Sequence, residues 1–285
     1  SGTILSSDGT VLPTGTEYSL EVQLYSAQPY VGVNVDADGS YDVNLVPDVY
    51  HIEFDYDLWY NDPERYSEIE GWFDNVVVSG HTTHNISLPL ITISGTITDP
   101  SGQPVPGSKI IHHGQTSGLS DSGYNVHGES FADANGNYSI ETMAVDTMSF
   151  QIFPTDGNTD LIAFALTDLN FTSDTVLPIT FPTATASLSG TIVGSDGTPL
   201  DHLSNFGTSG LEILMYKDDI YTNQAIGADG SYSISLTPGT YQLSVSHQVY
   251  QDNPEGLKDV RNSYTIFNYV VTGTQTNNIS LPTVT

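Results

Sequence analysis

The sequence contains no cysteine, only five lysine and arginine residues, and no long apolar run. Without cysteine the chain can form neither disulfide bonds nor thiolate metal sites, so its stability must come from packing and hydrogen bonding. Its 34 acidic residues give a formal net charge of −29, and a surface of this sign repels nucleic acid and anionic membranes. We therefore expect neither nucleic-acid binding nor membrane insertion.

The chain also lacks a recognisable secretory leader and any stretch of 18 apolar residues. We expect mature or excised material whose export signal or anchor lies outside it. High salt or divalent cations screen a strongly acidic surface, which favours an extracellular or cell-surface location. No cofactor is expected apart from a structural Ca²⁺ ion, for which the sequence indicates no location.

One β-rich unit is repeated along the sequence. The stretch GADGSYSISLTPGTYQLSVSH, residues 227–247, alternates apolar and polar residues on either side of a Pro-Gly turn, which predicts two half-buried strands. Similar text occurs as DADGSYDVNLVPDVYHIEF at 36–54 and, less closely, as DANGNYSIETMAVDTMSFQIF at 133–153. The marker SGTI stands at Ser1, Ser94 and Ser189, which indicates units of 93 and 95 residues.

We predict an all-β chain of three tandem seven-stranded β-sandwich domains, immunoglobulin-like or prealbumin-like, at 1–93, 94–188 and 189–285. The second is the most divergent. The junctions lack Gly/Ser-rich spacers, so we expect an extended rod. Nine apolar residues are predicted on the inner faces: Ile4, Tyr41, Tyr50, Ile97, Tyr138, Phe150, Ile192, Tyr232 and Tyr241.

The repeated text GTITDPSGQPVPGSKI, with FADANGNYSI and PGTYQLSV, resembles the carboxypeptidase regulatory-like family, whose fold is the transthyretin-like, Cna-B-like sandwich. The resemblance covers all three units and is strongest in the third. It implies an accessory, spacer or surface-display module without catalytic residues. Some Cna-B-type relatives form a Lys–Asn/Asp isopeptide bond, but residues 1–93 contain no lysine, so this bond cannot be general here.

The segment 59–74 combines aromatic and acidic side chains, and we predict that it forms a long loop over one end of the first sandwich. Aromatic faces stack on sugar rings while carboxylates accept hydrogen bonds from hydroxyls. Candidate carbohydrate contacts are therefore Trp59, Tyr60, Tyr66 and Trp72. Alternatively, these rings pack onto the sandwich or onto the neighbouring unit.

Three acidic residues, Glu53, Asp55 and Asp57, follow one face of a predicted strand about 7 Å apart. They form either a cation-binding stripe or an ordinary solvated face. Asp36-x-Asp38-Gly39 resembles the start of a calcium loop, but no bidentate glutamate follows at the required spacing, which indicates a turn. The adjacent His112 and His113 should point to opposite sides of an extended chain and make a poor chelate.

Four Asn-x-Ser/Thr sequons offer glycosylation sites in a secreted archaeal or eukaryotic protein. They begin at Asn85, Asn137, Asn170 and Asn278.

The sequence contains no Gly-x-Ser-x-Gly, His-Glu-x-x-His or phosphate-loop motif, so we expect no enzymatic activity. Our hypothesis is an extracellular structural module: a spacer, a stalk, or a fibre or filament segment of a surface or secreted protein. The alternative is a carbohydrate-binding or adhesive module that uses the segment 59–74. Expected partners are glycans and other copies or further repeats of the protein, arranged head to tail.

The ends of the chain bear on this expectation. NISLPTVT at the end and SGTI at the start fall one residue short of the junction at 85–97. Trimming explains this simply. The alternative is head-to-tail continuity, either as further units or as subunits joined by strand pairing at exposed edges.

Overall fold

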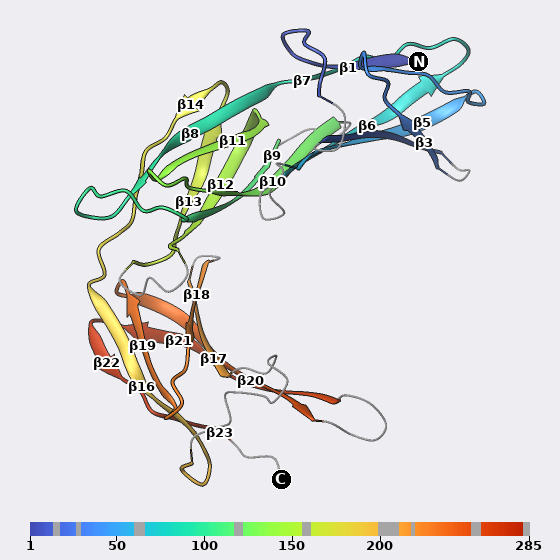
Figure 1. Cartoon of the computed structure of the whole chain (residues 1–285). Helices are drawn as coiled ribbons and strands as arrows, with labels where there is room; N and C mark the ends of the chain where they lie inside the picture. Colours follow the sequence, from blue (N-terminus) through green and yellow to red (C-terminus); the bar gives the residue numbers. More distant parts are fainter. Residues whose placement is uncertain are drawn as a thin grey trace. The chain divides into compact units, whose positions relative to one another are not determined.

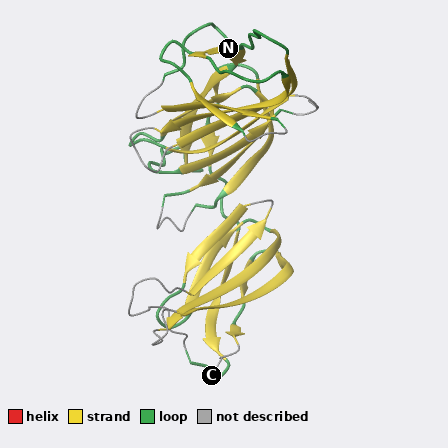
Figure 2. Cartoon of the chain, turned by 90° about the vertical axis from the view of Figure 1, so that its right-hand side faces the viewer, coloured by secondary structure: helices red, strands yellow, loops and turns green. Residues whose placement is uncertain are grey.

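The computed structural model describes residues 1–13, 18–26, 30–59, 66–116, 122–155, 161–198, 211–217, 220–251 and 258–281. All the elements in these ranges are β-strands (Figures 1 and 2), which confirms the all-β prediction. Within the same ranges, no helix is long and apolar enough to span a membrane. The chain divides into two compact units, one of Ser1–Thr155 with Leu166–Thr180 and one of Asp156–Ala165 with Phe181–Thr285.

The first unit is built on a large sheet in the order β13-β12-β9-β10-β6-β5-β2-β3 (Figure 1). Its strands are β2 (Tyr18–Tyr25), β3 (Val31–Asn34), β5 (Asp48–Trp59), β6 (Tyr66–Val78), β9 (Lys109–Gln115), β10 (Ser122–Phe131), β12 (Val145–Phe153) and β13 (Phe164–Phe171).

Two small sheets complete the first unit, one in each of the repeats that the sequence defines. Their orders are β4-β1-β7 and β11-β8-β14, with β15 also paired to β8. The strands are β1 (Gly2–Ser6), β4 (Ser40–Tyr41), β7 (Ile86–Leu88), β8 (Leu90–Thr98), β11 (Asn137–Met143), β14 (Thr175–Val176) and β15 (Ile179–Thr180).

The second unit repeats this plan once, with the sheets β18-β17-β20-β21 and β19-β16-β22, and β23 also paired to β16. One apolar cluster joins residues of both sheets, among them Leu188, Ile213, Ile234 and Leu243. The strands are β16 (Ala186–Gly194), β17 (Leu211–Lys217), β18 (Ile220–Ala225), β19 (Ser231–Leu236), β20 (Gly239–Gln251), β21 (Lys258–Val271), β22 (Thr274–Thr276) and β23 (Ile279–Leu281).

The first two repeats share one sheet because β6 of the first pairs antiparallel with β10 of the second. The register runs from Ser122 opposite Phe73 to Glu129 opposite Tyr66. At the centre of this seam, Ile69 and Val126 lie opposite each other and are both buried. Strand edges pair through backbone groups, which every residue carries, so the side-chain pattern does not predict this seam. Three separate seven-stranded sandwiches are therefore not what the described residues form, and the domain boundaries stay predictions.

The predicted core is confirmed residue by residue. All nine inner-face residues are at most 6% exposed. The Asp-Gly and Asn-Gly motifs are tight turns, as predicted, with positive φ at Gly39, Gly136 and Gly230. His112 is buried and His113 lies on the other face of β9, as the alternation predicts.

The repeated Ser-Gly-Thr and Tyr motifs meet at one contact in every repeat. The hydroxyls of Tyr41, Tyr138 and Tyr232 donate to the carbonyls of His84, Leu177 and Asn277 over 2.5, 2.6 and 2.5 Å. The glycine of each SGTI marker lies against the same carbonyl, where a Cβ atom would collide with the oxygen. The two motifs recur together because a close backbone approach requires a glycine and the buried carbonyl requires a donor.

Candidate functional site

The outer face of β2, β5 and β6 carries a dense set of carboxylates, here called the acidic face: Glu21, Glu53, Asp55, Asp57, Glu68 and Glu70. Strand register places Asp55 between Glu21 and Glu70, and places Asp57 opposite Glu68. Side chains directly opposite in an antiparallel pair lie about 5 Å apart at Cβ, so like charges are neighbours throughout this surface.

Repulsion within the acidic face changes the ionisation of its central residues. Partial burial and then the charges of Glu70, Glu53, Asp57 and Glu21 raise the pKa of Asp55 to about 6. Burial, followed by the charge of Glu70, also raises the pKa of Asp57. The face therefore holds its negative charge at neutral pH against an energetic cost.

This cost predicts a pH-dependent gain in stability for Asp55→Asn. Because the folded-state pKa of Asp55 is raised, the folded wild type is most stable below pH 4, where this carboxyl is protonated in both the folded and the unfolded state. That stability is lost as the pH rises through 6. After allowance for solvent screening, we expect the variant to be about 1 kcal/mol more stable at pH 7.5, with a Tm higher by roughly 2–4 °C. Calorimetry at low salt should show this difference in Tm at pH 7.5 and no difference at pH 4. Asp42→Asn, an exposed acid outside the acidic face, is the control.

A histidine bordering the acidic face is held between two carboxylates. His51 Nδ1 lies 2.5 Å from Asp74 Oδ1, and its Nε2 lies 2.8 Å from Glu53 Oε1. Burial alone would lower the pKa of His51, but these hydrogen bonds outweigh it and raise the pKa. On β10, His127 Nε2 lies 3.1 Å from Glu68 Oε2 and places a further imidazole beside the acidic face.

Two aromatic rings lie among these carboxylates. Trp72 stands opposite Glu53 on one side and Gly123 on the other, and any side chain at Gly123 would overlap the indole. The ring of Tyr66 meets that of His127 edge to face at 5.6 Å. Both aromatic residues are only partly buried. An aromatic plate bordered by carboxylates is chemically suited to a hydroxyl-rich ligand.

The prediction of a long loop over 59–74 is wrong for the residues that the structure describes. Trp59 ends β5, and β6 begins at Tyr66. In β6, Ser67, Ile69 and Gly71 face the core while acidic and aromatic residues alternate with them. The alternation of β6 is hard to recognise in the sequence because two of its inward-facing residues, Ser67 and Gly71, are small or polar and not apolar. Tyr60 and the side chain of Trp59 lie outside the described residues.

The structure thus brings two separate predictions onto one surface. Tyr66 and Trp72 share a face with the strand of Glu53, Asp55 and Asp57. Glu68 and Glu70 were predicted as carboxylates of the segment 59–74, but their place beside Asp57 and Asp55 was not. Glu21 and His127 were not predicted at all, because cross-strand register decides their proximity. The alternation in β6 was the available signal.

The geometry adds no support for a metal ion at Glu53, Asp55 and Asp57, or for glycans at the four sequons. Among the described residues, no group of three or more His, Asp or Glu side chains could hold a metal ion. All four sequon asparagines are exposed. The Oδ1 atoms of Asn85 and Asn278 accept hydrogen bonds from the backbone N–H groups of Thr3 and Thr191, both at 3.1 Å. This shared structural role accounts for the recurrence of these two asparagines.

Comparisons with known proteins show only distant likenesses. No protein-family model matches the sequence, and no curated protein matches it. The Bacillus anthracis TIE protein is 11% identical over 99% of this chain, with a TM-score of 0.25, and this chain spans 49% of its length. A streptococcal ancillary pilin is 12% identical over 98% of both chains, with a TM-score of 0.25. GBS52, the minor pilin of Streptococcus agalactiae, is 16% identical over 68% of this chain and 97% of its own, with a TM-score of 0.28. At these values the likeness carries no argument about function.

Proposed function

We propose that this protein is a non-catalytic structural module of an extracellular or cell-surface assembly, acting as a spacer, stalk or fibre segment. The observation that supports this most directly is the seam between β6 and β10, which joins two repeats through backbone hydrogen bonds along eight residue pairs. Such a joint resists extension better than a flexible linker does. The resemblance to carboxypeptidase regulatory-like modules, most of which are accessory or spacer domains, agrees with this proposal.

Single-molecule pulling between residues 1 and 285 tests the structural role. If the shared sheet bears load as one body, the first unit should unfold in one event that releases up to about 60 nm of chain, from residues 1–180 at about 3.4 Å each. Two separate events of about half that length, at different forces, would contradict a load-bearing joint between the repeats.

A second candidate function is glycan binding on the acidic face, supported by the partly exposed indole of Trp72, which lies over Gly123 and opposite Glu53. A glycan array of the wild type and Trp72→Ala tests it, with Phe267→Ala, an exposed ring of the second unit, as the matched control. A specific sugar bound by the wild type and the control but not by Trp72→Ala would establish this function. Equal profiles for all three proteins would exclude Trp72 as a sugar platform.

A further inference from the structure

A histidine is buried where the first two repeats share their sheet. His112 of β9 is 1% exposed and points to the inner face, where its ring meets that of Phe150 edge to face at 6.5 Å. Across the seam, its Nε2 atom lies 3.4 Å from the Oγ atom of Ser67 on β6, a residue that is also buried. The imidazole therefore contacts both repeats, although β10 lies between β9 and β6.

A glycine lets the ring reach across β10. Gly128 stands opposite Ser67 on one side and opposite His112 on the other. A Cβ atom at Gly128 would lie 2.7 Å from His112 Cε1 and 2.8 Å from Ser67 Cα, so the ring occupies space that a side chain would need. Because β6 covers His112 on this side, separation of β6 from β10 would uncover the ring.

The surroundings of His112 favour the neutral imidazole. Its Nδ1 atom has no hydrogen-bond partner among the described residues, so a second ring proton would find no acceptor there. Burial, followed by the charges of His113 and His127, lowers the pKa of His112 to about 3. In mildly acidic solution the ring therefore stays neutral while it is buried and takes up a proton once it is exposed, which favours the opened seam.

The other titratable groups on the strands around His112 set the background for such a response. On the inner face, burial raises the pKa values of Tyr124 on β10 and Tyr138 on β11, so neither brings a charge. On the outer face, Glu68 Oε2 and His127 Nε2 face each other across the seam at 3.1 Å, so a proton on His127 would strengthen the seam. The remaining groups on β6, β9, β10 and β12 lie on the outer face or are exposed: Tyr66, Glu70, Asp74, Lys109, His113, Glu129 and Asp146.

We propose that the seam between the first two repeats is acid-sensitive, and that His112 weakens it by taking up a proton when β6 separates from β10. Such a response would regulate the load-bearing joint of the proposed structural role, on which its biological meaning rests. Because the folded-state pKa is lowered, the stability that His112 contributes is complete above pH 6.5 and is lost as the pH falls toward 3. Within this window, each pH unit makes opening about tenfold more favourable.

Amide exchange of the full chain measures the opening of the seam. His112→Gln keeps a polar side chain at this position and cannot be protonated. After correction for the intrinsic exchange rate, the protection of amides in β6 and β10 should fall about 30-fold further between pH 7.5 and pH 5 in the wild type than in His112→Gln. This difference between the two proteins removes the contributions of His127 and the acidic face, which both proteins share.

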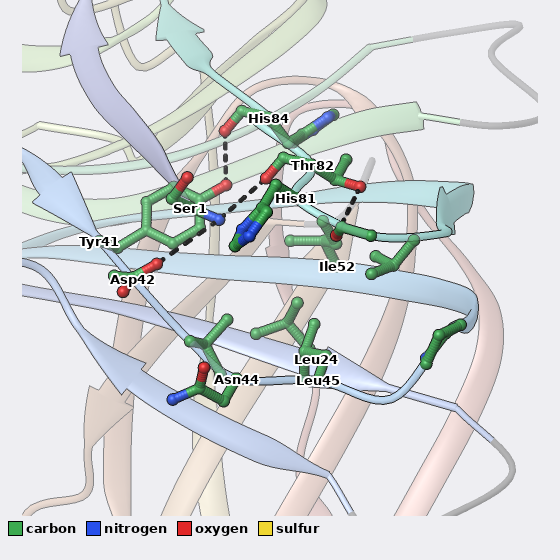
Figure 3. Close-up of a pocket in the computed structure, with 14 residues that line it drawn as sticks. Ser1, Leu24, Tyr41, Asp42, Asn44, Leu45, Ile52, His81, Thr82 and His84 are labelled. Atoms are coloured by element: carbon green, nitrogen blue, oxygen red, sulfur yellow. Dashed lines mark hydrogen bonds and ion pairs between the residues drawn. The ribbon is translucent and has the colours of Figure 1, made fainter.

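His81→Gln is the matched control. His81 is exposed and lines a cavity of about 360 Å³ in the first repeat, together with Tyr41 and Thr82 (Figure 3). The lining residues of this cavity lie outside the stretch of β6 that pairs with β10. His81→Gln should therefore follow the pH dependence of the wild type.

Nuclear magnetic resonance of the wild type adds a measurement that needs no variant. The ring protons of His112 should keep the chemical shifts of a neutral imidazole in the folded protein down to pH 5. Titration of this ring near pH 6.5 in the folded protein would overturn the proposal, even if His112→Gln folds poorly. Equal pH dependence of exchange in the wild type and His112→Gln, or an equal change in His81→Gln, would also overturn it. Neither measurement applies force, so a failure here is distinguishable from a failure of the structural role in the pulling experiment.

Discussion

Replacing Gly95 by alanine is expected to destabilise the first unit by about 3 kcal/mol. The new methyl group would collide with the Leu177 carbonyl oxygen, and this oxygen also accepts the hydrogen bond of the Tyr138 hydroxyl. Overpacking against rigid backbone costs up to about 3 kcal/mol, and loss of a buried hydrogen bond adds about 1 kcal/mol. A fall in Tm of roughly 10 °C by calorimetry is the expected result.

Gly80→Ala provides the matched control, because no atom lies within 4 Å of the Cβ position at Gly80 and its φ is not in the left-handed region. This variant should unfold within about 1 °C of the wild type. Gly190→Ala should reproduce the effect in the second unit, where the carbonyl belongs to Asn277. A Gly95→Ala protein as stable as the control would show that the SGTI glycine is not required by this contact.

Replacing Phe54 by alanine should have an effect of similar or greater size, about 3–5 kcal/mol. Phe54 is fully buried, and its ring lies 6.3 Å from that of Phe73 and 6.0 Å from that of Tyr124. Tyr124 belongs to β10, so this aromatic cluster spans the seam between the first two repeats. The cavity should therefore weaken both repeats together.

Hydrogen exchange distinguishes shared from local destabilisation. In Phe54→Ala, amides of β2 in the first repeat and of β9 in the second should lose protection by the same free energy. Met215→Ala, an equally buried residue of the second unit, should leave both strands unchanged. Loss confined to β2 would mean that the two repeats fold separately despite their common sheet.

Repulsion between carboxylates destabilises the folded protein most on the acidic face, where the negative charges lie closest together. Asp55 sits at the centre of the acidic face, and partial burial, followed by the charges of neighbours on three strands, raises its pKa to about 6. Added salt should stabilise the wild type at neutral pH through screening, and a divalent cation would do so more strongly. A structural Ca²⁺ ion stays a proposal for this protein.

Much of the fold was determined by the sequence alone, because side-chain alternation and turn chemistry act locally. Tyr41, Tyr138 and Tyr232 follow Asp-Gly or Asn-Gly turns and lie in the core, as predicted, since a period of two places every second residue on one face. The repeated glycine of SGTI was visible as a motif, although its partner carbonyl was not.

Tertiary structure alone decided two things. Pairing of β6 with β10 depends on backbone groups that every residue carries, so nothing in the side-chain pattern predicts it. The acidic face depends on register, which sets Glu21, Asp55 and Glu70 side by side although 34 and 15 residues separate them along the chain.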